Sequence, residues 1–189
     1  LPIAPGTLRN LKKCPIGDRN WTDESRELFI RLLASGPALL NVWEDIDFID
    51  VPGKLIPEWL GVRNRPSASA AHRYTIDRHM VEVVTRLGRE TPSGGRYDDR
   101  HYEALLLAGI LHDIGKRPGV ANHAAEGARH ATVVVERMGF DRDIVRWVTL
   151  LVREHLTLSE FATGRNPNDP NVGDDLAGRL DHNPVLLDM

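Results

Sequence analysis

The sequence predicts an all-α fold. Apolar residues recur at the three- and four-residue spacing of a helix face, as in residues 28–33 and 76–87. No segment shows the sustained period-two alternation of a half-buried strand, and the valines at 133–135 lie inside a helical pattern. The stretch 104–111 is apolar almost all round, which is typical of a helix at the centre of a domain. We therefore expect a helical bundle around that central helix.

The N-terminal third is expected to be less regular than the rest. Prolines and glycines punctuate residues 1–20, which predicts an arm or loop. The first helix begins at the Thr-Asp pair 22–23, since both residue types favour helix N-caps, and it stops at the Gly-Pro pair 36–37. Further prolines and glycines in 51–71 indicate a connector, with a turn of helix around 56–60.

The remaining pattern is helical, with breaks at glycine-rich and polar stretches. Helices are expected over 38–48, 75–87, 102–112, 123–138, 141–156 and 175–180, with loops over 88–99 and 164–173. The chain then divides into an arm (1–20), a helical extension with its connector (21–71) and a main domain (72–189). Because it begins at Leu1 and not at a methionine, we expect it to be a piece of a longer multidomain protein.

Composition excludes several classes of protein. With 189 residues, 41% of them hydrophobic, the chain is long enough to bury a core. The 24 Lys and Arg residues against 27 Asp and Glu residues give a net charge of −3, which argues against a nucleic-acid partner. The single cysteine, Cys14, excludes an intramolecular disulfide and a cysteine-based zinc cluster. The sequence contains no membrane-length apolar run and no visible signal peptide, so we expect a cytoplasmic protein without a membrane partner.

A histidine and an aspartate stand side by side where the apolar stretch ends. His112 and Asp113 follow 104–111 directly. Burying such a pair is costly unless the two side chains find partners or bind a metal ion. Imidazole together with carboxylate suits Mn, Fe, Zn, Ni or Co, and a water-rich site also suits Mg. The pair is therefore the first candidate for a metal site.

Three other histidines are expected to point inward. His79 lies on the apolar stripe of the 75–87 helix, and His155 lies on the stripe of the 141–156 helix. His123 starts its helix. Side chains on inner faces or ends of separate helices can converge on one point with His112 and Asp113. The alternative is a set of core or capping histidines whose hydrogen bonds are satisfied within the protein.

The order of these residues resembles the HD superfamily of metal-dependent phosphohydrolases. That order is His79, the His112-Asp113 pair, His123, His155 and Asp169. The flanking sequence is similar to PII uridylyltransferase/uridylyl-removing enzymes over 55–59, 62–63, 72–79, 111–116 and 152–156. The resemblance runs from about residue 25 to the C-terminus and implies an HD-domain helical bundle with extra N-terminal helices, whose main domain is 72–189. In that family a nucleotidyltransferase domain and ACT domains flank the HD domain, and glutamine would act through the ACT domains.

The resemblance also implies a metal-ligand set. Its core ligands would be His79, His112, Asp113 and Asp169. His123 and His155 would complete a second metal site or contact phosphate, and Asp113 would bridge two ions or orient the attacking water. The loop 117–123 departs from the family's glycine-rich pattern, so the number of ions stays open at one or two. Mn²⁺ or Mg²⁺ is expected first, with Fe or Zn as alternatives.

Other charged residues near these ligands are candidates for phosphate contacts. Lys116 follows the His-Asp pair by three residues and is the first candidate, so His112, Asp113 and Lys116 form the expected catalytic group. Arg73 and Arg78 flank the first histidine ligand, and either is also consistent with a surface salt bridge. His72 is a candidate for a supporting position behind the ligands or a structural one.

The implied reaction is hydrolysis of the phosphodiester that joins UMP or AMP to a tyrosine of the signalling protein PII. The partner would then be nucleotidylated PII. A second reading is an HD phosphohydrolase that acts on free nucleotides or cyclic dinucleotides. A third is a module that binds PII or relays signals without catalysis. The complete ligand set favours an enzyme over the third reading.

Overall fold

The computed structural model describes residues 3–15, 21–67, 74–88, 98–166, 169 and 171–189. In chain order its helices are α1 (Pro5–Lys13), α2 (Asp23–Leu33), α3 (Ala38–Phe48), α4 (Val51–Leu55), the 3₁₀ helix η1 (Pro57–Gly61), α5 (Ile76–Leu87), α6 (Asp99–Leu111), α7 (His123–Arg137), α8 (Arg142–Glu154), α9 (Thr157–Gly164), α10 (Asn171–Arg179) and α11 (Pro184–Asp188). Within these ranges the only bridge is an isolated pair, Pro66 with Thr75. The all-α prediction is confirmed, and the arrangement is consistent with an HD-type bundle.

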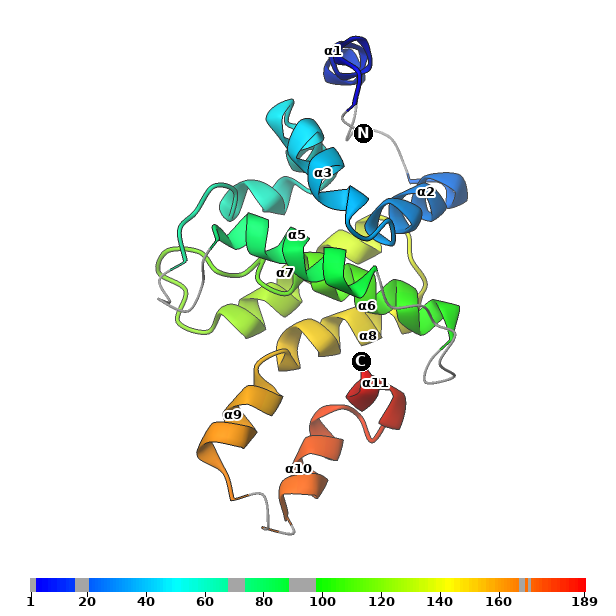
Figure 1. Cartoon of the computed structure of the whole chain (residues 1–189). Coiled ribbons are helices and arrows are strands. Elements are labelled where there is room, and N and C mark those ends of the chain that lie inside the picture. Colours follow the sequence, from blue (N-terminus) through cyan, green and yellow to red (C-terminus); the bar gives the residue numbers. More distant parts are fainter. Residues whose placement is uncertain (1–2, 16–20, 68–73, 89–97, 167–168, 170) are drawn as a thin grey trace.

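Helix α6 is the centre of the bundle, as its composition predicts. Every residue from Ala104 to Leu111 is buried. Helices α5, α8, α7 and α2 all pack against it. Figure 1 shows α5–α8 in the middle of the molecule, with α1–α3 on one side and the α9–α10 hairpin extending from the other. No helix in the described ranges is long and apolar enough to cross a membrane.

Side-chain caps fix where several helices begin. Thr22 Oγ1 accepts a hydrogen bond from Ser25 N at 3.1 Å, so α2 starts at the predicted position. Asp98 Oδ1 accepts from His101 N at 2.9 Å and moves the start of α6 to Asp99, three residues before the predicted one. These caps satisfy backbone N–H groups that have no partner within the helix.

The predicted N-terminal loop is wrong over α1. Its proline, Pro5, occupies the first helical turn, where the missing N–H is not needed. Ile3, Leu8 and Leu11 pack against the core, and Ile3 N donates to Asp45 Oδ2 at 2.9 Å. Tertiary packing therefore stabilises a short helix that local residue preferences alone do not predict.

The C-terminal part is more helical than expected. Helix α9 ends at the predicted loop, but α10 begins at Asn171 and not at Asp175. Helices α9 and α11 were not predicted, and α4 forms within the predicted connector. Asn183 caps α11 by accepting from Val185 N at 3.0 Å. Leu150, Leu180 and Leu186 form a small separate apolar cluster. Through this cluster the C-terminal segment packs against α8.

Glu58 holds η1 against α7 through a two-pronged ion pair with Arg137, at 2.9 and 2.7 Å. Burial of Glu58 raises its pKa, but hydrogen bonds from Arg137 and its own backbone, with the Arg137 charge, outweigh burial and leave the pKa below the ordinary 4.5. We expect Glu58→Gln to lower the free energy of unfolding at pH 7 by roughly 0.5–1 kcal/mol, since solvent screens the half-exposed arginine.

The pH dependence of that loss checks its cause. A carboxylate with a lowered pKa stabilises the fold fully above its unfolded pKa, and this contribution disappears as the pH falls through the folded pKa. The difference in urea unfolding between wild type and Glu58→Gln is therefore expected to be constant above pH 4.5 and to shrink below it. A difference that does not change down to pH 3 would assign the effect to packing.

Candidate metal centre

Four helices bring the predicted histidines and Asp113 together. His79 comes from α5, His112 caps the C-terminus of α6, and His155 caps the C-terminus of α8. His123 is the first residue of α7. Asp113, only 1% exposed, lies in the middle of the group. The predicted convergence of these five side chains is therefore present in the structure.

The two carboxylate oxygens of Asp113 face different pairs of histidines. Oδ2 lies 3.9 Å from His79 Nε2 and 3.3 Å from His112 Nε2. Oδ1 lies 3.9 Å from His123 Nε2 and 3.5 Å from His155 Nε2. One triad is His79, His112 and Asp113, and the other is Asp113, His123 and His155. Within each triad the potential ligand atoms all lie within 4.8 Å of one another. This is the arrangement in which one carboxylate can serve two ions.

Backbone carbonyls fix the orientation of two of the histidine rings. His112 Nδ1 lies 2.8 Å from Gly109 O, and His155 Nδ1 lies 2.7 Å from Val152 O. A carbonyl only accepts, so Nδ1 carries the hydrogen in both rings. The neutral ring then presents its Nε2 lone pair toward Asp113, which is the tautomer that a metal ligand needs.

Unpaired polar atoms in the centre fit a metal ion. Asp113 Oδ1, His123 Nε2 and His155 Nε2 are buried and have no hydrogen-bond partner among the described residues. Buried polar atoms without partners are costly and rare in folded proteins. Oxygen and imidazole nitrogen are also the donors that divalent transition ions accept. The donor set and its unmet bonding capacity both fit a divalent ion.

The electrostatics of the centre keep its ligands in the metal-binding form. Burial opposes ionisation of Asp113, but the neighbouring side chains of His112, His155 and Lys116 outweigh burial and hold its pKa well below the usual range. Burial, followed by the charge of Lys116, lowers the pKa of His123. A carboxylate and a neutral imidazole are the states that bind a cation.

The chain is similar in sequence to a set of curated bacterial enzymes. No family model matches it, and no solved structure does. It is 40% identical over 151 residues, 79% of the chain, to a bifunctional uridylyltransferase/uridylyl-removing enzyme of Streptomyces coelicolor. It is 34% identical over its whole length to the enzyme of that name from Mycobacterium tuberculosis H37Rv. The chain is homologous to one segment of this enzyme family. It spans about a fifth of the length of these relatives, 17% and 23% respectively.

Of the predicted phosphate contacts, Lys116 lies at the candidate metal centre. Its Nζ lies 2.8 Å from Asp113 Oδ2. Arg78 instead pairs with Glu44 and with Glu82, the latter at 3.2 Å, and its role in phosphate binding stays a prediction. His72 and Arg73 lie outside the described residues.

Asp169, the last ligand implied by the family pattern, is not brought to the centre. It lies in the chain between α9 and α10. Its Oδ1 accepts from Asn171 N and Asn171 Nδ2, both at 2.9 Å. Neither ligand triad includes it. The sequence offers no periodicity that selects it, and its role as a ligand stays a prediction.

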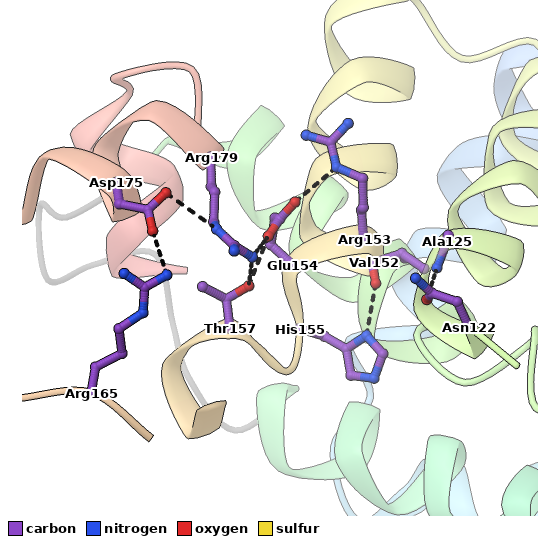
Figure 2. A network of polar contacts seen from close by, with 10 residues as sticks. All are labelled: Asn122, Ala125, Val152, Arg153, Glu154, His155, Thr157, Arg165, Asp175 and Arg179. Atoms are coloured by element: carbon purple, nitrogen blue, oxygen red, sulfur yellow. Dashed lines mark hydrogen bonds and ion pairs between the residues drawn. The ribbon is translucent and has the colours of Figure 1, made fainter. Parts of the chain in front are cut away.

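Sequence reasoning missed a polar network beside the centre, drawn in Figure 2. Glu154 accepts hydrogen bonds from Thr157 Oγ1 at 2.7 Å, Arg153 Nε at 2.8 Å and Arg179 at 3.3 Å. Its side chain is only 12% exposed. Arg179 reaches it from α10, so the network ties the C-terminal hairpin to the end of α8. The one sequence signal was the position of Glu154 directly before His155.

Sequence reasoning also missed Gly115. A Cβ added there would lie 2.2 Å from His123 O and 2.3 Å from Gly127 N. Both are backbone atoms of α7, so the turn after Asp113 packs directly on the helix that carries His123. This contact sets how closely Asp113 and His123 approach each other. Only a residue without a side chain allows it.

Proposed function

We propose that the chain is a metal-dependent phosphodiesterase domain that removes UMP or AMP from a tyrosine of the signalling protein PII, in nitrogen regulation. The observation that carries the proposal is Asp113, whose two oxygens each face a pair of histidines. The names of the relatives, which include uridylyl removal, support the reaction class. The substrate, the partner and the cytoplasmic location are part of the proposal.

The ligand set supports one or two divalent ions. His79, His112 and Asp113 would hold one ion, and Asp113, His123 and His155 would hold the other. Mn²⁺ and Mg²⁺ are proposed first, with Fe or Zn as alternatives. When bound, such ions acidify a water molecule and neutralise charge on the phosphoryl oxygens.

The chain's own residues would orient the reacting groups. The carbonyls of Gly109 and Val152 hold two of the imidazole rings in place, so little reorganisation is needed when substrate binds. Lys116 is within reach of Asp113 and offers a positive charge to the phosphoryl oxygens as negative charge develops there. A phenolate leaving group departs without needing a strong acid, because its pKa of about 10 is far below that of an alkyl alcohol.

Nucleotide release from nucleotidylated PII tests this function. The chain with Mn²⁺ is expected to release UMP or AMP, and chromatography of the product identifies which. Asp113→Ala removes the shared ligand and is expected to reduce release at least 100-fold, given that even residues behind the ligands cost 10–100-fold. Asp77→Asn is the matched control, because Asp77 is a buried aspartate outside both ligand triads. Absence of release from metal-loaded wild type would contradict the proposal.

A further inference from the structure

Two pockets adjoin the metal centre, and different histidines line them. The first has a volume of about 420 Å³ and includes His79, His112 and His155 in its wall. The rest of that wall is mostly aliphatic and comes from α5, α6, α8 and the C-terminal helices α9–α11. It includes Leu105, Leu151, Leu158, Leu176 and Leu187. Eight leucines beside three histidines make an apolar pocket next to the candidate metal centre.

The second pocket is polar. It has a volume of about 430 Å³, and His123 contributes to its wall. The other lining side chains offer hydrogen-bond donors, acceptors and charges of both signs, and they include Asn122, Arg153, Thr157, Glu160 and Arg179. A ligand with several hydroxyl or carbonyl groups finds partners here that the apolar pocket lacks.

The Glu154 network separates the two pockets. Glu154 and Thr157 line both. The hydrogen bond between them, at 2.7 Å, and the contact of Arg179 with Glu154 hold this partition in place (Figure 2). Because Glu154 directly precedes His155, the partition is anchored beside a candidate metal ligand. A group bound at the centre therefore has an apolar space and a polar space within reach.

We infer that the two pockets divide the substrate: the apolar pocket receives the aromatic ring of the tyrosine, and the polar pocket receives the nucleoside. This assignment rests on the proposed function. A phosphodiester has two ester arms, and the arms of this one differ sharply in polarity. An aromatic ring gains by leaving water for an aliphatic wall. Ribose and base carry polar groups that need hydrogen-bond partners when they leave water.

Binding to the metal-free chain tests the division with one probe for each pocket. N-acetyltyrosinamide represents the aromatic arm, and uridine, which carries no phosphate, represents the nucleoside arm. NMR titrations in EDTA give the dissociation constant of each. Leu158→Asp adds a charge to the apolar pocket, and Arg153→Gln removes one from the polar pocket. Leu158 is 58% exposed and the Arg153 side chain 47%, so neither variant disturbs the core.

The expected result is a crossed pattern. Leu158→Asp weakens binding of N-acetyltyrosinamide about tenfold and leaves uridine within about twofold of wild type, and Arg153→Gln does the reverse. Each variant is thus the control for the other. A reversed pattern, loss of both ligands in one variant, or the absence of saturable binding by either ligand would overturn the division.

Nucleotide release separates failure of the division from failure of the proposed function. Release from nucleotidylated PII without the crossed binding pattern would overturn the assignment of the pockets and leave the phosphodiesterase proposal standing. The absence of release from chain that binds Mn²⁺ would overturn the proposed function, and with it the assignment that rests on it.

Discussion

Gly115→Ala is expected to lower the free energy of unfolding by about 3 kcal/mol or more, or to prevent folding. The added methyl group would lie 2.2 Å from His123 O and 2.3 Å from Gly127 N. Backbone atoms in the middle of a packed bundle cannot move aside as the end of a flexible side chain can. The turn after Asp113 must therefore separate from α7. Urea unfolding followed by circular dichroism measures the loss.

A second glycine provides the control. Gly178 lies in α10, and nothing is within 4 Å of a Cβ added there. Gly178→Ala is expected to leave stability unchanged or to raise it by up to about 1 kcal/mol, because alanine favours the helix. Equal stability of the Gly115→Ala and Gly178→Ala variants would show that the turn after Asp113 has room to relax.

Asp113→Asn is expected to weaken Mn²⁺ binding at least 100-fold. Loss of a residue that only hydrogen-bonds to a metal ligand typically lowers metal affinity 10–100-fold, and Asp113 would be a ligand itself. The carboxylate faces both triads, so one substitution removes a charged oxygen from each. The amide is neutral, and its nitrogen is a donor that repels a cation. Calorimetric titration of the metal-free chain with Mn²⁺ measures the affinity.

The matched control for this substitution is Asp77→Asn. Asp77 is 7% exposed and accepts a hydrogen bond from Asn64 N at 2.8 Å, away from both triads. It is expected to keep the wild-type Mn²⁺ affinity, whatever its effect on stability. If Asp113→Asn also binds Mn²⁺ as wild type does, the centre described here is not the metal site.

Features that depend on one helix and its caps could be predicted from sequence. The central position of α6 followed from its apolar residues, and the start of α2 followed from Thr22. The stripes of α5 and α8 placed His79 and His155 on inward faces, so their meeting with Asp113 was expected. Local periodicity carries this information because it records which side of each helix is buried.

Features that depend on contacts between distant segments could not be predicted. Helix α1 forms because Ile3, Leu8 and Leu11 pack against the hydrophobic core. The sequence of the first twenty residues does not indicate that they contact the core. The closeness of Gly115 to α7 depends on how two helices approach each other. The link from Arg179 to Glu154 joins positions 25 residues apart, which no helical period relates.

The C-terminal ends of two helices meet at the candidate metal centre. Helices α6 and α8 end at His112 and His155. Aligned peptide dipoles give each such end about half a negative charge, whereas α7 begins at His123 and presents the opposite end. The backbone therefore adds to the negative charge of Asp113. A cation is attracted to this point and a phosphate is repelled, so the fold favours an order of binding in which the ion enters before the phosphodiester.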